Sequence, residues 1–130
     1  MKPLNHIIKT IALLAIVFSC TNNSDQSQEE DLNELNNLKE EVEQLITTGN
    51  CTENANCSYI AFGSKPCGGP WSFLVYSTNI DTDLLISKVS NYNQLENEYN
   101  IKWGIISDCS TPTPPTSVEC IEEKCKGIYN

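Results

Sequence analysis

Apolar residues recur at helical spacing in residues 31–50. Leu35, Leu38, Val42 and Leu45 are separated by intervals of 3, 4 and 3 residues, which places them on one face of an α-helix. We predict a helix in which Asp31 is the N-cap, Glu34 completes a capping box and Gly49 follows the last turn. The apolar face is expected to pack on a sheet of the same domain, and pairing with a helix of another protein is the alternative.

A second helical pattern covers residues 79–100. Its apolar stripe repeats at intervals of 4, 3, 3 and 4 residues and consists of Leu85, Val89, Tyr92, Leu95 and Tyr99. Asp81 is the predicted N-cap, and Asn91 and Asn93 are positions where the helix bends or divides. Asp81 and Asp83 resemble a metal-binding or catalytic pair, but the free N–H groups and dipole of a helix start attract acidic residues. We therefore interpret this pair as capping.

Shorter segments rich in aromatic and β-branched residues are typical of strands. They are residues 58–64, residues 71–78, residues 103–110 and a closing hairpin over residues 118–130 with its turn near Glu122 to Lys124. The proline-rich residues 111–117 cannot form an interior ladder and are expected to be a connection. The sequence thus predicts a small α+β domain stapled by disulfides, in which two helices cover an antiparallel sheet of about four strands.

The segment between the first two predicted strands concentrates residues that restrict the backbone. It consists of Lys65, Pro66, Cys67, Gly68, Gly69, Pro70 and Trp71. The glycines permit positive φ, the prolines fix φ, and an oxidised Cys67 ties the loop to another segment. A stiff loop loses little entropy on binding, so this is the candidate binding loop. The favoured interpretation is that its rigidity serves the fold alone, because nothing marks a residue for cleavage.

The first twenty residues have the pattern of an export signal. Lys2 and Lys9 precede an uninterrupted apolar run over residues 11–18. The run is too short to span a bilayer as an ordinary helix but suits the core of a signal peptide. A buried N-terminal helix is the alternative.

The end of this run, VFSC at residues 17–20, resembles the lipobox of bacterial lipoproteins. The resemblance implies that residues 1–19 are removed as a lipoprotein signal peptide and that Cys20 becomes the first mature residue, carrying palmitate-like acyl chains. More than one such chain gives stable membrane anchoring. The implied location is the bacterial cell envelope, with the outer membrane or the cell surface preferred to the inner membrane. Residues 20–30 are polar and acidic and are expected to be a flexible tether before a single domain over residues 31–130.

Six cysteines remain after Cys20 is set aside: Cys51, Cys57, Cys67, Cys109, Cys120 and Cys125. An even set in a small exported domain indicates three disulfides, whose pairing the sequence leaves open. A metal site is disfavoured, because the only histidine, His6, lies in the signal segment and no C-x-x-C pair is present. We expect neither a metal nor another cofactor.

The cysteine pattern carries a second resemblance. The order Cys-x5-Cys, GSKPCGGPW, LVYS, SDC and a terminal Cys-x4-Cys is similar to small cysteine-rich exported bacterial proteins of uncharacterised function. This similarity extends from Cys51 to Cys125. It supports the disulfide assignment and implies no activity.

The charge balance narrows the possible partners. The chain has 17 acidic residues, 8 lysines and no arginine, and its net charge is −9. We therefore exclude nucleic acid as a partner.

No triad or phosphate-binding loop is present after Cys20, so we predict that the protein is not an enzyme. The expected function is a lipid-anchored binding module outside the cytoplasm, with a protein as one possible partner. The alternatives are a protease inhibitor that presents the Lys65–Trp71 loop and a small structural protein of the envelope. The oligomeric state is left open.

Overall fold

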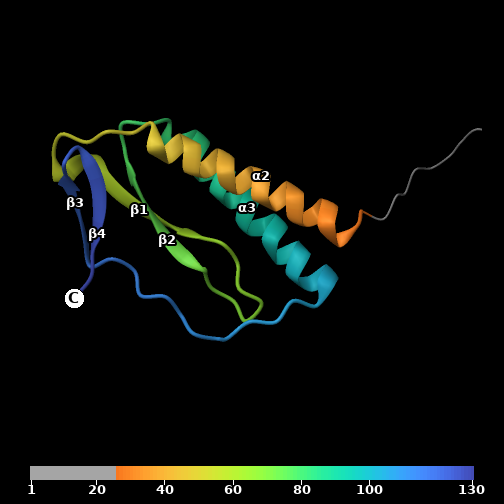
Figure 1. Cartoon of the computed structure of the whole chain (residues 1–130). Helices are drawn as coiled ribbons and strands as arrows, with labels where there is room; N and C mark the ends of the chain where they lie inside the picture. The colour runs from red at the N-terminus through yellow and green to blue at the C-terminus, as the bar shows by residue number, and fades with distance from the viewer. Residues whose placement is uncertain (1–25) are drawn as a thin grey trace, which may run out of the picture.

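The computed structural model describes residues 26–130. Its elements are, in chain order, α2 (Gln28–Thr47), the short 3₁₀ turn η1 (Asn54–Asn56), β1 (Cys57–Phe62), β2 (Ser72–Ser77), α3 (Thr82–Trp103), β3 (Ser117–Ile121) and β4 (Lys124–Ile128). The predicted small α+β fold with disulfides is confirmed. Its four strands pair as two separate antiparallel hairpins, β1–β2 and β3–β4 (Figure 1).

The predictions for the signal peptide, residues 1–19, and for acylation of Cys20 lie outside the described residues. Within residues 26–130, neither helix combines the length and the apolar character that crossing a bilayer requires.

Helix α2 begins one turn earlier than predicted. Its N-cap is Ser27, whose side chain accepts the N–H of Glu30, while the Glu30 carboxylate accepts the N–H of Ser27. This capping box satisfies two of the free N–H groups of the first turn, so helix residues 28–30 occupy the end of the predicted tether. The predicted cap at Asp31 is wrong, because that side chain instead binds residues at the end of α3.

Helix α3 has the predicted N-cap, since the Asp81 carboxylate accepts the N–H of Leu84 at 2.9 Å. It runs without a break to Trp103 and ends at Gly104, whose φ of +61° is left-handed. The strand predicted over residues 103–110 is therefore wrong: Trp103 completes the helix, and residues 105–116 form no regular structure. A glycine at this position is a standard helix stop.

The hydrophobic core lies between the two helices and the β1–β2 hairpin. Its buried members are Leu35, Val42, Phe62, Tyr76, Leu85, Val89 and Tyr92. The helices run antiparallel side by side, as Figure 1 shows and as the ion pairs Lys88–Glu41 and Lys102–Asp31 require. The apolar seams predicted for both helices thus face the domain's own interior.

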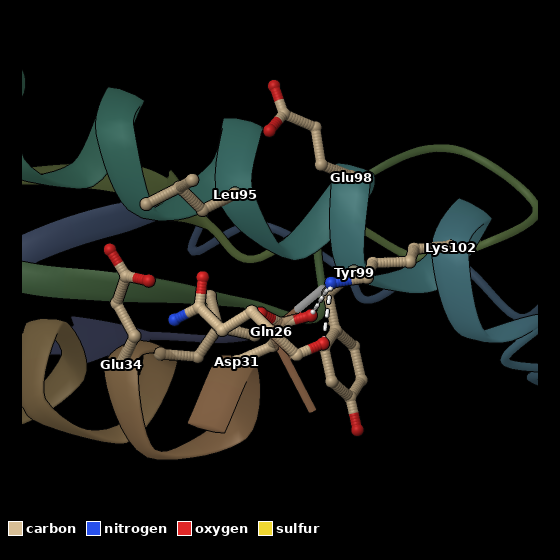
Figure 2. Close-up of a pocket in the computed structure, with 8 residues that line it drawn as sticks. Gln26, Asp31, Glu34, Leu95, Glu98, Tyr99 and Lys102 are labelled. Atoms are coloured by element: carbon tan, nitrogen blue, oxygen red, sulfur yellow. Dashed lines mark hydrogen bonds and ion pairs between the residues drawn. The ribbon is translucent and has the colours of Figure 1, made fainter. Parts of the chain in front are cut away.

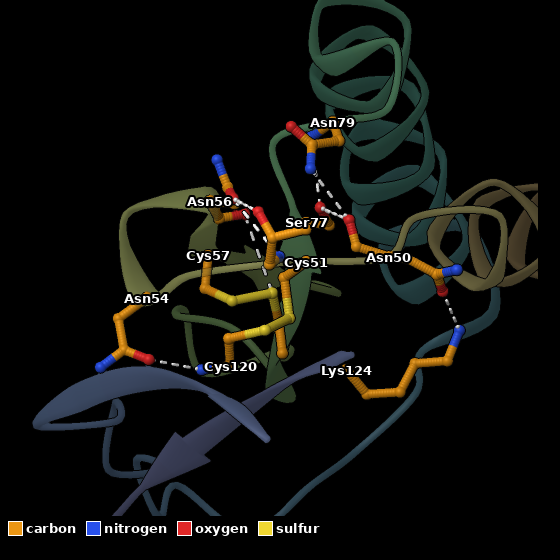
Figure 3. The surroundings of a disulfide bond; sticks show 11 residues. Asn50, Cys51, Asn54, Asn56, Cys57, Ser77, Asn79, Cys120 and Lys124 are labelled. Carbon is orange, nitrogen blue, oxygen red and sulfur yellow. Dashed lines mark hydrogen bonds between the residues drawn. A yellow bond between two sulfur atoms is a disulfide. The ribbon is translucent and has the colours of Figure 1, made fainter. Parts of the chain in front are cut away.

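The C-terminal hairpin is confirmed, with Glu122 and Glu123 in its two-residue turn. Both turn residues have positive φ, which matches the right-handed twist of the flanking strands. Two neighbouring disulfides hold the hairpin to the chain around η1: Cys51–Cys120 before this turn and Cys57–Cys125 at the start of β1 (Figure 3). In addition, the Asn54 side chain accepts the N–H of Cys120 at 2.8 Å.

Candidate functional site

The Lys65–Trp71 loop is fixed by its first side chain as well as by its cysteine. Lys65 is only 6% exposed, and its ammonium donates to Asp108 Oδ1 at 2.9 Å and to the Ser110 carbonyl. The same ammonium lies 4.8 Å from the centroid of the Trp71 ring. The lowered pKa of the Asp108 carboxyl reflects the hydrogen bond from Lys65, with a smaller contribution from Ser110. The loop therefore has a rigid base.

A third disulfide, Cys67–Cys109, ties the exposed end of the loop to the same segment. The tip is a tight turn in which Gly68 N–H donates to the Lys65 carbonyl and Lys65 N–H donates to the Gly69 carbonyl. Gly68 and Gly69 have φ of +91° and +83°, conformations that other residues rarely adopt. The tip thus exposes backbone and offers no long side chain to a protease pocket.

Three polar side chains of α3 hold the chain just before this loop. Asn93 Oδ1 accepts the N–H of Gly63 at 2.6 Å, the Glu96 carboxylate accepts the N–H of Ser64, and Asn100 Nδ2 donates to the Ser64 carbonyl at 2.7 Å. The sequence pointed to Asn93 only as a place where the helix bends or divides, which is wrong because α3 is continuous there, and Glu96 and Asn100 were not selected. Their spacing of three and four residues was the available signal, because it places them on one helix face.

Beside the loop lies a cavity of about 450 Å³, which we call the aromatic hollow. It is lined by Lys39, Glu43, Phe62, Gly63, Trp71, Ser72, Leu74, Tyr92 and Glu96. The Phe62 and Tyr92 rings are stacked, with centroids 4.4 Å apart. Trp71 is 41% exposed and packs against Gly63, where an added Cβ would come within 2.6 Å of the indole. Of the predicted loop, therefore, only Trp71 lines the hollow.

Glu96 is the half-buried carboxylate of the aromatic hollow. Its Oε1 accepts a hydrogen bond from the Tyr92 hydroxyl at 3.2 Å, and its Oε2 accepts the N–H of Ser64. Burial raises the pKa of the Glu96 carboxyl, although these two hydrogen bonds and the charge of Lys39 act in the opposite direction. Burial also raises the pKa of Tyr92, and the negative charge of Glu96 adds to that effect.

A second cavity, of about 290 Å³, lies between the start of α2 and the end of α3. In Figure 2 the side chains of Asp31 and Lys102 point toward each other, whereas the Glu98 carboxylate points away from them. Asp31 Oδ2 accepts hydrogen bonds from Lys102 at 2.7 Å and from the Trp103 indole at 2.8 Å. The hydrogen bond from Lys102 is the main reason that the pKa of Asp31 is lowered. These side chains already form hydrogen bonds with one another and thereby connect the two helix ends. They leave few free polar groups for a ligand.

Within residues 26–130, the cluster of side chains that could hold a metal ion consists of cysteine sulfurs. The Sγ atoms of Cys51, Cys57 and Cys125 lie within 4.8 Å of one another. Each belongs to a disulfide, so none offers the thiolate that a metal ion binds.

Comparisons of this chain with protein-family models, with curated proteins and with solved structures find no match. The function is therefore inferred from the chemistry of the aromatic hollow and from the sequence.

Proposed function

We propose that this protein is a lipid-anchored binding module of the bacterial cell envelope and that its ligand enters the aromatic hollow. Three disulfides support a location outside the cytoplasm, because thiol-reducing systems keep most cytoplasmic cysteines reduced. The resemblance of VFSC at residues 17–20 to a lipobox supports the anchor. The outer membrane or the cell surface is the proposed site of attachment.

The aromatic hollow is the observation that carries the binding function. Its volume of about 450 Å³ suits a small molecule or a protruding side chain. It combines a partly exposed indole with a half-buried carboxylate, whose pKa burial raises. Binding sites commonly combine apolar walls with a few such polar groups.

The rigid loop contributes indirectly to this site. Lys65 and the Cys67–Cys109 disulfide hold the loop, and the loop in turn holds Trp71 at the wall of the hollow. Because the wall is already ordered, a ligand loses less of its binding energy to ordering the protein. This arrangement supports a binding site beside the loop more than a reactive loop of a protease inhibitor.

A fragment screen tests the proposal. The ¹⁵N-labelled mature chain with Cys20→Ser, which lacks the lipid attachment point, is mixed with small soluble fragments, and amide shifts are recorded. We expect the shifts to cluster at Gly63, Trp71 and Glu96, and Trp71→Ala to abolish them. Trp103→Ala is the matched control and should leave them in place. If the shifts scattered over the surface or did not appear, the binding function would be rejected in favour of a structural role in the envelope.

A further inference from the structure

We propose that the aromatic hollow binds an organic cation, an alkylammonium or guanidinium group, between the Trp71 ring and the carboxylate of Glu96. This inference rests on the proposed function and specifies its ligand class. Three features of the hollow support it: its aromatic rings, its charged side chains and the environment of the Glu96 carboxylate.

The rings supply the first feature. A cation is attracted to the face of an aromatic ring, most strongly to that of tryptophan. The hollow has the exposed Trp71 at its wall and the stacked Phe62 and Tyr92 at its base. The Trp71 ring already has such a contact within the protein, because Lys65 lies 4.8 Å from its centroid while Asp108 neutralises the lysine.

The charges supply the second feature. Two carboxylates, Glu43 and Glu96, line the hollow together with one ammonium, Lys39. Lys39 lies 3.9 Å from Glu43 in a surface pair. No basic side chain within residues 26–130 forms an ion pair with Glu96. The hollow therefore has an excess negative charge, and the net charge of −9 on the chain attracts cations from a distance.

The third feature is the uncompensated negative charge of the Glu96 carboxylate. Its two hydrogen-bond donors, Ser64 N–H and the Tyr92 hydroxyl, are both neutral. Burial raises its pKa because the carboxylate loses water, and the charge of Lys39, which forms no ion pair with it, offsets that loss only in part. A bound ammonium or guanidinium would supply that missing charge. An anionic ligand would meet two carboxylates, and a neutral one would leave the charge of Glu96 uncompensated.

Choline and 3,3-dimethylbutan-1-ol provide a test, because they have nearly the same shape and differ in charge. Each is titrated into the ¹⁵N-labelled, oxidised mature chain with Cys20→Ser, and the shift of the Trp71 indole N–H is followed. We expect choline to bind about tenfold more tightly than the neutral alcohol. We expect Glu96→Gln to remove most of that difference and to leave binding of the alcohol unchanged.

Glu98→Gln is the matched control, because Glu98 lies on the same helix but lines the second cavity. It should leave the preference for choline intact. Glutamine at position 96 can still accept the Ser64 N–H, and an unchanged amide spectrum elsewhere would show that the fold is retained.

The pH dependence provides a second readout. The charged or titratable groups near Glu96 are Tyr92 on α3 and Lys39 and Glu43 on α2. Because a cation prefers the ionised carboxylate, choline affinity should rise with pH as Glu96 loses its proton, and Glu96→Gln should remove most of this rise.

The outcomes separate this inference from the proposed function. Equal binding of both probes, unaffected by Glu96→Gln, would overturn the cation preference and leave the hollow as a binding site. If neither probe bound while fragments still bound in the hollow, the cation inference alone would be rejected. If no compound bound there, both proposals would be rejected.

Discussion

The two halves of this domain, the helices with β1–β2 and the β3–β4 hairpin, are stabilised by different interactions. In the first half, α2, α3 and β1–β2 enclose a core in which Leu85 and Val42 are 0% exposed. In the second half, every residue of β3 and β4 is exposed or half-buried. The hairpin is joined to the first half by two disulfides, whose cysteines are separated by 69 and 68 residues in sequence. Packing therefore organises the first half, and covalent bonds position the second.

This difference shows how a small chain compensates for a limited core. A hairpin of two strands is at best marginally stable on its own. Disulfides stabilise such an element by restricting the unfolded chain, without requiring additional buried surface. The candidate site lies in the first half and uses both kinds of support, since the core supplies Phe62 and Tyr92 while the Cys67–Cys109 disulfide braces the loop that carries Trp71.

Removal of the two hairpin disulfides should have the largest effect. Replacement of Cys51, Cys57, Cys120 and Cys125 by Ala should lower the free energy of unfolding by about 4 kcal/mol or more, the effect of opening one loop of this length. Hydrogen exchange should show that β3 and β4 lose nearly all of their protection, while α2 and α3 lose only as much as the drop in global stability requires. Replacement of Cys67 and Cys109 is the control and should leave the hairpin protected. Equal loss of protection in the helices would contradict the division into two halves.

Leu85→Ala should destabilise the protein by about 3 kcal/mol, because it leaves a cavity in a fully buried position. Urea unfolding would measure this effect, and hydrogen exchange should show that the helices and β1–β2 lose protection. The neighbouring Leu84 is 42% exposed, so Leu84→Ala should change the unfolding free energy by less than about 0.5 kcal/mol. Similar losses at both positions would contradict the assigned core.

Lys65→Met should cost about 1 kcal/mol, through loss of the hydrogen bonds to Asp108 and Ser110. The cost is limited because the Asp108 side chain is 71% exposed and remains hydrated without its partner. Exchange of the Gly68 amide, which is hydrogen-bonded to the carbonyl of residue 65 within the loop, should accelerate, whereas Lys126→Met on the exposed hairpin should have no such effect. An unchanged exchange rate would show that the lysine does not brace the loop.

The smallest expected effect is the contribution of Glu96 to the pH dependence of the unfolding free energy. Because the pKa of Glu96 is higher in the folded protein, its protonation favours folding below the usual glutamate range. That contribution is lost as the pH rises through the folded-state pKa. Asp31 and Asp108, with lowered pKa values, act in the opposite sense, and their contribution is lost as the pH falls. Urea unfolding at several pH values should show that Glu96→Gln is stabilised relative to the original protein as the pH rises. A pH-independent difference would contradict the raised pKa.

The sequence predicted those features that local patterns encode. The apolar stripes located both helices, and the Asp81 cap and the hairpin turn at Glu122 and Glu123 were predicted correctly. The strand over residues 103–110 was not, because Trp103 continues the apolar stripe of α3 and belongs to that helix. Gly104 directly after this stripe was a local signal for the end of the helix, but the apolar residues that follow it favoured a strand in the prediction.

Local sequence patterns could not predict contacts between segments that are distant in sequence. Asp31 has the spacing of a helix cap, but its carboxylate binds Lys102 and Trp103 at the end of α3. The disulfide pairing and the aromatic hollow likewise depend on how the elements meet in space. The loop was selected for its glycines and cysteine, whereas its only residue in the hollow is Trp71.

Mass spectrometry of the protein isolated from the membranes of its native host tests the central claim most directly, since the proposed export to an oxidising compartment would allow these disulfides to form. We predict an acylated N-terminus at Cys20 and the linked pairs Cys51–Cys120, Cys57–Cys125 and Cys67–Cys109. A chain that retained residues 1–19 and whose thiols all reacted with an alkylating reagent would contradict the account.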